Sequence, residues 1–422
     1  MLNRRSLVPA PAAAGPSTAP AGAYRRNHYI DVLKGLAALN IVFIHTVFNS
    51  GANYVPDWLR ALSLAVDVPF FFFLSGWAVA SMPAIRYQKT FASLWAIYVQ
   101  WVLFVVATFI VMAAVAAATA LPLGSRRDFI ANFLGNLVLE NPNTPLPFHG
   151  VMGGGWFLVV YFAVIPVMSF AIAFIRRYTD SLKPIALLLL VCLVGYVRVQ
   201  AGGQFFFFGQ YFLCYSAFFL IGFLQRDLFL RAWQALALIA MSLAGLWVAL
   251  RLHGAALIDM QSLKFAPSMA WVCFSLVAIV VAMSAKRWQF RITGRGPLTW
   301  VGKNALPFFF TNAVAASLVM FLEPMVSLPW VAKLVVCYAI TLSITAVLVV
   351  LFNRMHSLAS RGGSQLTAAL LASLAASRQS AERGATSTDS SPVPVPRSRP
   401  ATQSASRRPP TTELASRHRA SV

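Results

Sequence analysis

The chain has 422 residues, of which 59% are hydrophobic and only 11% are charged. Soluble domains carry about 25% charged residues, so this composition argues against a soluble enzyme and against a secreted protein. The net charge of +22 lies largely in the two ends of the chain and in short loops, not on a basic face with interleaved aromatic rings, which argues against nucleic-acid binding. The apolar residues form repeated runs of about 20 residues, the length that crosses a bilayer. The sequence therefore predicts a polytopic membrane protein.

Both ends of the chain are polar and basic. Residues 1–27 are rich in Ala, Pro, Ser and Gly and contain no apolar signal-peptide segment, so we expect a disordered cytoplasmic lead. Residues 357–422 contain one short apolar stretch followed mainly by Ser, Pro, Thr and Arg. We expect a largely disordered basic cytoplasmic tail there, which favours an anionic membrane surface. Residues 28–356 then form the transmembrane domain.

Ten apolar segments between these ends are predicted to cross the bilayer as helices, because an open sheet leaves backbone groups unpaired in lipid. With the N-terminus inside, the inner loops carry eleven Lys and Arg residues and the outer segments six, so both termini are expected in the cytoplasm. The predicted fold class is all-α, with about ten transmembrane helices. The segments lie near residues 30–50, 58–82, 91–118, 151–175, 182–200, 205–225, 231–250, 264–285, 297–322 and 329–352.

The first segment contains Asp31, Lys34 and His45, and ionisable residues inside a membrane segment are functional candidates. His45 follows Lys34 by eleven residues, which is about three helical turns and about 16 Å, so both lie on nearly the same face. Asp31 precedes Lys34 by three residues, close enough to pair with it. His45 is a candidate general base, because imidazole exchanges protons near neutral pH. A snorkelling Lys34 and a structural, hydrogen-bonding His45 are the alternatives.

The second segment ends in a run of phenylalanines followed by Ser75 and Gly76. These two small residues would let another helix or a ligand approach the backbone closely. Arg86 and Lys89 follow on the cytoplasmic side, three residues apart. They are candidates for binding phosphate groups, although the positive-inside rule alone also accounts for them.

In combination, these motifs resemble the membrane-bound acyltransferase-3 family. The resemblance rests on Asp31-x-x-Lys34-Gly35, on the spacing of Lys34 to His45, and on Phe72-Phe73-Leu74-Ser75-Gly76. Gly155-Trp156-Phe157-Leu158 is similar to the family's tryptophan motif, and Val301-Gly302-Lys303-Asn304-Ala305-Leu306 to its late glycine motif. The plan of ten spans with the N-terminus inside is also that of the family.

The resemblance covers about residues 25–355 and implies transfer of an acyl group, expected to be acetyl, from cytoplasmic acyl-CoA to a hydroxyl of a sugar or polysaccharide. It implies that His45 is catalytic and that Lys34 and Asp31 belong to the same motif. The family's Arg-x-x-Arg motif is matched only in part by Arg86 and Lys89, because lysine lacks the bidentate fork of arginine.

Arg86 and Lys89 are assigned to acyl-CoA binding, together with Ser75 and Gly76. Trp156, His149, Asn304 and Thr311 are the candidates for acceptor binding. Trp156 is expected to stack on a sugar ring or to anchor the chain at the interface. The family often has a second histidine in the late span, but this chain has Asn312 there, which cannot act as an acid or base.

Two mechanisms remain open, with His45 as general base or as the nucleophile of a transient acyl-histidine. A transporter or flippase for a glycan or lipid-linked substrate is the competing function, and a scaffold in an envelope complex is a third. The four cysteines lie in apolar segments without metal-site spacing, so we predict no metal site. No bound cofactor is expected, and the resemblance implies acyl-CoA as cosubstrate. The many Ala and Arg residues indicate a bacterial protein, so we expect a multi-pass protein of the bacterial cytoplasmic (inner) membrane.

Overall fold

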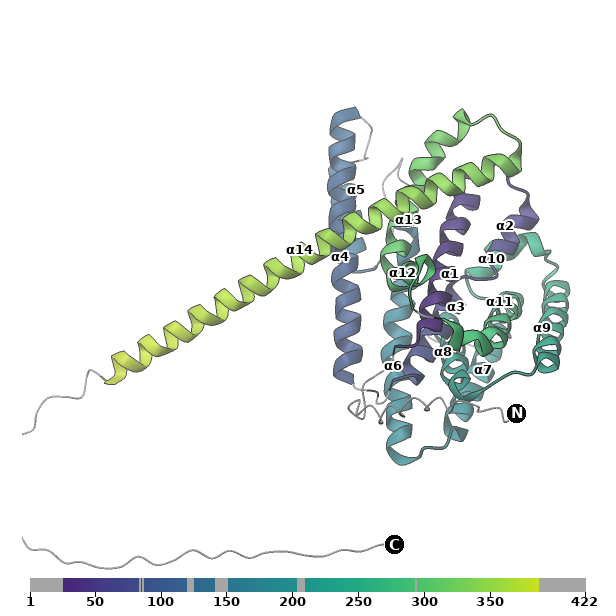
Figure 1. Ribbon diagram of the computed structural model, residues 1–422, viewed down its shortest axis with the longest axis horizontal. Helices are drawn as coiled ribbons and strands as arrows, with labels where there is room; N and C mark the ends of the chain where they lie inside the picture. Colours follow the sequence, from purple (N-terminus) through teal and green to yellow (C-terminus); the bar gives the residue numbers. More distant parts are fainter. Residues whose placement is uncertain are drawn as a thin grey trace, which may run out of the picture. The chain divides into compact units, whose positions relative to one another are not determined.

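The computed structural model describes residues 26–82, 85, 87–119, 125–140, 151–202, 209–292 and 294–386, and in these residues it contains no strand (Figure 1). Nine helices in this part of the chain are long and apolar enough to span a membrane. A shorter apolar helix, α8 (Gly209–Leu224), corresponds to the remaining predicted segment. The predicted all-α polytopic fold is therefore confirmed.

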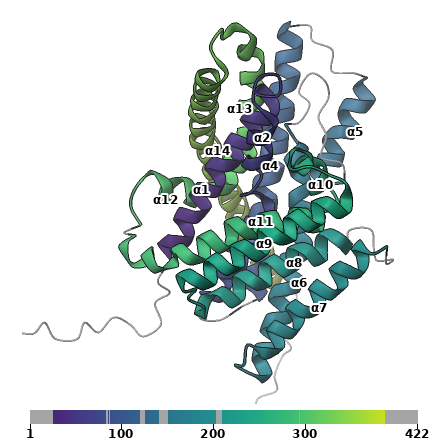
Figure 2. The same cartoon turned by 90° about the vertical axis from the view of Figure 1, so that its right-hand side faces the viewer.

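The helices follow one another along the chain without long irregular insertions in the described ranges. They are α1 (His28–His45), α2 (Asp57–Ser63), α3 (Val68–Ala80), α4 (Tyr87–Thr119), α5 (Arg126–Leu137), α6 (Trp156–Tyr178), α7 (Lys183–Gln200), α8 (Gly209–Leu224), α9 (Ala232–His253), α10 (Met260–Lys264), α11 (Met269–Ser284), α12 (Pro297–Lys303), α13 (Ala305–Leu322) and α14 (Trp330–Thr386). Helix α1 packs against α3, α12 and α13, while α9 lies beside α11 and α7 beside α8 (Figure 2).

Two predicted segments are broken helices. The segment predicted at 58–82 divides into α2 and α3, because the Asp67 side chain caps a new helix by accepting a hydrogen bond from the Val68 amide, with Pro69 in its first turn. The segment predicted at 297–322 divides into α12 and α13 at Asn304. Helix α1 itself ends at His45 and continues as a π-helical turn, Thr46–Ser50. Such turns are frequent at functional sites.

Glycines let helices cross at backbone contact in two places. A Cβ atom at Gly302 of α12 would collide with the carbonyl oxygen of Asp31 in α1. A Cβ atom at Gly76 of α3 would collide with the carbonyl oxygen of Phe219 in α8. Small residues permit this close approach of membrane helices. As a result, α12 packs directly against the backbone of α1, and α8 packs directly against the backbone of α3.

Two basic side chains, the buried Lys286 and the exposed Arg226, cap helix ends on the side predicted to be cytoplasmic. The Lys286 ammonium donates hydrogen bonds to the carbonyl oxygens of Gln225, Arg226 and Leu228, at 2.9, 2.6 and 2.9 Å. The Arg226 guanidinium donates to the carbonyl oxygen of Ala80, the last residue of α3, at 2.8 Å. Cations at helix C-termini complement the helix dipole, so Lys286 and Arg226 stabilise the fold. Their positive charge also favours the predicted orientation of the chain in the membrane.

The chain divides into two units, residues 1–359 and residues 360–422. Helix α14 continues from the first into the second and ends at Thr386. Residues 357–386 are thus helical, whereas the sequence indicated a largely disordered tail from residue 357. The difference has a physical reason, since this stretch is rich in Ala, Leu and Ser with Arg and Gln, and several of these are strong helix formers. Residues 1–25 and 387–422 lie outside the described part of the chain.

Candidate active site

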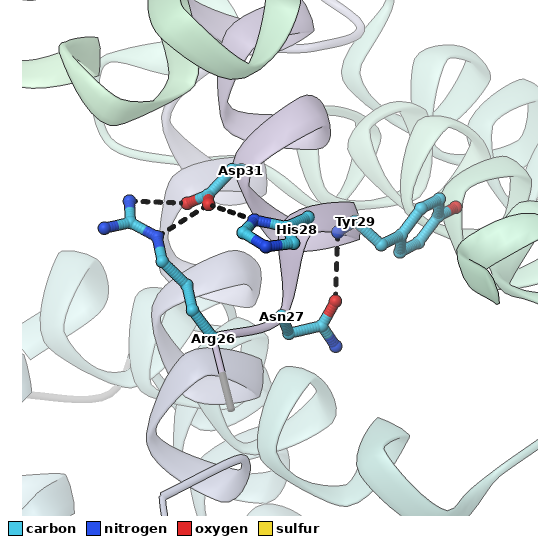
Figure 3. Close-up of polar contacts among 5 residues, drawn as sticks. All are labelled: Arg26, Asn27, His28, Tyr29 and Asp31. Atoms are coloured by element: carbon cyan, nitrogen blue, oxygen red, sulfur yellow. Dashed lines mark hydrogen bonds and ion pairs between the residues drawn. The ribbon is translucent and has the colours of Figure 1, made fainter. Parts of the chain in front are cut away.

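The predicted pairing of Asp31 with Lys34 is not formed. Both oxygens of the buried Asp31 carboxylate accept hydrogen bonds from Arg26, at 2.7 Å from Nε and 2.8 Å from Nη2 (Figure 3). The Nδ1 atom of His28 lies 3.5 Å from the same carboxylate. A guanidinium presents two parallel N–H donors that match the two oxygens, a planar fork that an ammonium lacks, and the carboxylate is bound by Arg26, just before the helix.

Lys34 is consequently left without an ion pair or hydrogen bond among the described residues. Its side chain lines two adjoining cavities. The first, here called the Lys89 cavity, has a volume of about 220 Å³ and is lined by Lys34, Ser75, Met82, Lys89, Ser93 and Tyr161, among others. The second, here called the Phe309 cavity, has a volume of about 280 Å³, and its lining includes Lys34, Val68, Phe71, Ser75, Phe157 and Phe309. Lys34 and Ser75 belong to both, so the two cavities adjoin, and we refer to the pair as the passage.

The residues predicted to bind acyl-CoA are distributed unequally around this passage. Ser75 lines both cavities, and its hydroxyl lies 3.5 Å from that of Tyr161. Lys89 lines the cavity named after it. Gly76 instead faces α8, where it permits the helix crossing described above. Arg86 lies outside the described residues.

His45 lies beyond the Phe309 cavity, within electrostatic range of Asp67 and Lys264. These two residues form an ion pair, with 2.6 Å between Asp67 Oδ2 and Lys264 Nζ, and both are buried. The Nδ1 atom of His45 is also buried and has no hydrogen-bond partner in the described part of the chain. Ile44, next to His45, packs in the same buried cluster as Trp271, the ring that lies near the Lys264 ammonium. An imidazole with an unused nitrogen therefore lies in the same region of the fold as a buried anion and a buried cation.

Asp67 is held in place from α1. Asn40, five residues before His45, donates hydrogen bonds from Nδ2 to the carbonyl oxygens of Ser63 and Val66, at 2.7 and 2.8 Å. These bonds fix the short connection between α2 and α3, which ends at Asp67. The capping bond from Asp67 to the Val68 amide, 2.8 Å, then fixes the carboxylate.

Lys264 is enclosed by aromatic rings. Its ammonium lies 5.8 Å from the ring centre of Trp156, 5.5 Å from that of Phe265 and 6.0 Å from that of Trp271. Trp156, predicted from the sequence to bind the acceptor, thus belongs to the same cluster as His45. We call His45, Asp67, Lys264 and Trp156 the His45 cluster.

The other predicted acceptor residues are elsewhere. Asn304 accepts a hydrogen bond from Asn353 of α14 at 2.8 Å, and Thr311 donates to the carbonyl oxygen of Pro307 at 2.9 Å. Neither residue lines the two cavities. The break between α12 and α13 at Asn304 separates the two residues that an unbroken helix would have aligned. His149 lies outside the described residues.

Sequence reasoning missed Asp67, Lys264 and Asn40. Asp67 lies inside an apolar segment, and the rule that identified Lys34 and His45 applies to it equally. Lys264 counted only as a loop charge in the orientation of the chain. Its pairing with Asp67 joins two distant parts of the sequence, so no local pattern could have revealed it.

The passage approaches the His45 cluster but does not reach it. Val68, which follows Asp67 directly, lines the Phe309 cavity. Phe71 and Phe309 line it as well, and both pack against the buried cluster that includes Ile41 and Ile44 of α1. We call Phe71 and Phe309 the aromatic layer, because they line the cavity and also pack against the α1 side chains that neighbour His45. Among the described residues, no group of three His, Cys, Asp or Glu side chains is placed to hold a metal ion.

Residues 27–350 match a family model described as an acyltransferase domain. The matched residues include α1, the lining of both cavities and the whole His45 cluster. The chain has no match among curated proteins or among solved structures.

Proposed function

Because the chain belongs to the acyltransferase-3 family and is a membrane acyltransferase, we propose that it moves an acetyl group from cytoplasmic acetyl-CoA to a hydroxyl of a cell-envelope or exported glycan. The bias of lysine and arginine toward the inner loops supports an orientation with Lys89 at the cytoplasmic side, in a bacterial inner membrane. A transporter or a scaffold would not account for the family match.

The unpaired ammonium of Lys34 is the observation that carries the proposal. A cation in a largely apolar passage is costly unless an anion joins it, and Asp31 is already bound by Arg26. The phosphates of acyl-CoA are such anions. We propose that Lys89 and Arg86 hold them near the cytoplasmic opening, while Lys34 faces the part of the donor that enters the passage.

The same geometry supports a path for the thioester. The Lys89 cavity leads past Ser75 into the Phe309 cavity, which ends beside Val68 and the aromatic layer. Lys34 and His45 lie about 16 Å apart along the same helix. The passage starts at Lys34 and runs in the direction of His45. A narrow acyl-pantetheine arm that enters from the cytoplasm would bring its thioester toward His45, while the acceptor arrives from the outer side near Trp156.

His45 then acts as the general base. It takes the proton of the acceptor hydroxyl while the hydroxyl oxygen attacks the thioester carbonyl carbon. The carbon–sulfur bond breaks, and the proton passes to the sulfur of CoA. In the alternative route, the His45 nitrogen attacks the thioester carbon and the carbon–sulfur bond breaks, so CoA leaves as the thiolate. The acceptor hydroxyl then attacks the acyl-histidine carbon, the carbon–nitrogen bond breaks, and the hydroxyl proton passes to the CoA thiolate.

The test uses inverted membrane vesicles, which expose the cytoplasmic face, with radiolabelled acetyl-CoA and a glycan preparation from the host. We expect labelled glycan with the unmodified protein, none with His45→Ala, and undiminished labelling with His253→Ala. His253 is an exposed histidine at the end of α9 and serves as the matched control. Label that stays on the protein would identify the acyl-histidine route. Transfer that survives His45→Ala would contradict a catalytic His45.

A further inference from the structure

The connection between α10 and α11, residues 265–268, is held by more hydrogen bonds than a short surface loop needs. The carbonyl oxygen of Pro267 accepts three of them from side chains, two from α7 and one from α8. The donors are Tyr196 Oη at 2.7 Å, Gln200 Nε2 at 2.7 Å and Gln210 Nε2 at 2.9 Å. The Ser268 hydroxyl caps α11 by accepting from the Trp271 amide.

Within this connection, Ala266 adopts a left-handed backbone conformation with φ of 69°. Its amide donates to the Tyr211 hydroxyl at 2.6 Å. A residue with a Cβ atom is strained there, and such strain persists only where the surroundings over-determine it, which is most common at functional sites. Here the hydrogen bond from the Ala266 amide and the three bonds accepted by the Pro267 carbonyl oxygen hold the strained conformation in place. What the connection holds in place is the residue before it, Lys264, the last residue of α10.

Lys264 differs from Lys286, the buried lysine that caps helix ends, in how many of its N–H donors are used. An ammonium has three N–H donors, and Lys286 makes three hydrogen bonds to backbone carbonyls. Lys264 makes a single ion pair, with Asp67, and no hydrogen bond to any described residue accounts for its remaining donors. A buried ion pair is in itself weak support for stability, because both charges lose their water. The arrangement thus presents spare cationic donors beside His45.

We propose that Lys264 is the cation that stabilises the oxyanion of the acyl-transfer reaction at His45, with Asp67 and residues 265–268 as its positioning residues. The inference rests on the acyl transfer proposed above. When the acceptor oxygen bonds to the thioester carbon, the carbonyl electron pair moves to the carbonyl oxygen, and His45 holds the hydroxyl proton. The oxyanion lies against the Lys264 ammonium, which keeps its own proton throughout. As the carbonyl re-forms, the carbon–sulfur bond breaks and His45 returns the proton to the CoA sulfur.

The Asp67 carboxylate keeps the Lys264 charge oriented between turnovers. The Phe309 cavity supports this placement, because its lining includes Val68, next to Asp67, and Phe157, next to Trp156. The acyl carbonyl would thus come from the passage and move past Phe71 and Phe309 to reach the Lys264 ammonium. A preorganised charge of this kind stabilises the transition state more than the ground state.

The experiment compares Lys264→Met, Lys264→Arg and the double variant Asp67→Asn/Lys264→Met with the unmodified protein, and uses the acyl-CoA that the unmodified protein transfers. Lys183→Met, at an exposed position at the start of α7, is the matched control. We expect Lys264→Met to lower kcat by about 100- to 1,000-fold, the usual effect of removing one oxyanion donor. The KM for acyl-CoA should change little, and Lys264→Arg should recover part of kcat.

The double variant separates catalysis from folding, since it removes the carboxylate that Lys264→Met leaves buried and unpaired. Its purified yield and thermal midpoint should return toward those of the unmodified protein while kcat stays low. Recovery of kcat in the double variant would overturn the proposal, because Lys264 would then serve only to neutralise Asp67. If the unmodified protein transfers no acyl group from any acyl-CoA, the proposed function fails first, and the role of Lys264 with it.

Discussion

The Asp67 carboxylate lies 2.6 Å from the Lys264 ammonium, and this buried pair joins the start of α3 to the end of α10 beside His45. Neither residue belongs to the helix that carries His45. The hydrogen bonds of Asn40 fix the first partner from α1, and the strained connection at Ala266 fixes the second. The charge environment of the histidine is therefore set by three separate parts of the fold.

Arg26→Met tests whether Arg26 keeps Lys34 free for the donor. With Arg26 removed, the buried Asp31 carboxylate would be left to Lys34, three residues on, with which it already interacts electrostatically. We expect the KM for acyl-CoA to rise about tenfold, equivalent to about 1.4 kcal/mol, with a smaller effect on kcat. Steady-state kinetics in detergent would measure it.

The double variant Arg26→Met/Asp31→Asn is the control for that prediction, because it removes the competing carboxylate. Its KM should return close to that of the unmodified protein. A KM that rises equally in both variants would show that Arg26 acts on the donor directly.

Gly76→Ala tests the crossing of α3 and α8. The new methyl group would collide with the carbonyl oxygen of Phe219, so the helices must separate. We expect a loss of about 1–3 kcal/mol in stability, as for other overpacked sites, seen as a lower thermal midpoint in detergent. Gly153→Ala is the matched control, since a Cβ atom there meets no atom within 4 Å. Equal midpoints for the two variants would contradict the crossing.

Lys286→Met tests the capping cation. The substitution removes the donor of three hydrogen bonds and leaves the carbonyl oxygens of Gln225, Arg226 and Leu228 without it. Each unsatisfied buried group costs about 1–3 kcal/mol, so we expect a marked fall in the thermal midpoint. Lys183→Met, exposed and outside this network, should leave the midpoint unchanged. Retention of the midpoint by Lys286→Met would show that water replaces the ammonium.

Phe309→Ala tests whether the aromatic layer limits the length of the acyl chain. The Phe309 ring packs against that of Phe157, with 5.1 Å between ring centres, at the end of the passage. Its removal should enlarge the Phe309 cavity and raise kcat/KM for butyryl-CoA relative to acetyl-CoA. The exposed Phe321 of α13 provides the control variant, Phe321→Ala. An unchanged ratio would mean that another residue sets the chain length.

The sequence alone predicted most of the fold, because membrane helices are specified by the length of their apolar runs. It did not predict where helices break, since the breaks at Asp67 and Asn304 depend on capping and on proline inside otherwise apolar segments. Helical spacing correctly placed Lys34 and His45 on one helix. It wrongly predicted that Asp31 pairs with Lys34, because Arg26, which binds the Asp31 carboxylate instead, precedes the helix.

The candidate site was predictable only where it lies on one element. Trp156 was identified from its motif, but its neighbour Lys264 was not, because their contact forms only when α6 and α10 are brought together. Asn304 and Thr311 were candidates for acceptor binding, but their side chains bond to Asn353 and to the Pro307 carbonyl oxygen and line neither cavity. Tertiary structure determined which of these polar residues met around His45.

The most direct test of the central claim asks whether the acyl group crosses the membrane within the protein. Purified protein is reconstituted into proteoliposomes with the acceptor glycan trapped inside and radiolabelled acetyl-CoA, which does not cross the bilayer, added outside. We predict that glycan in the lumen becomes labelled with the unmodified protein and with His253→Ala, but not with His45→Ala. Labelling that occurs only when donor and acceptor share one side of the membrane would contradict the account.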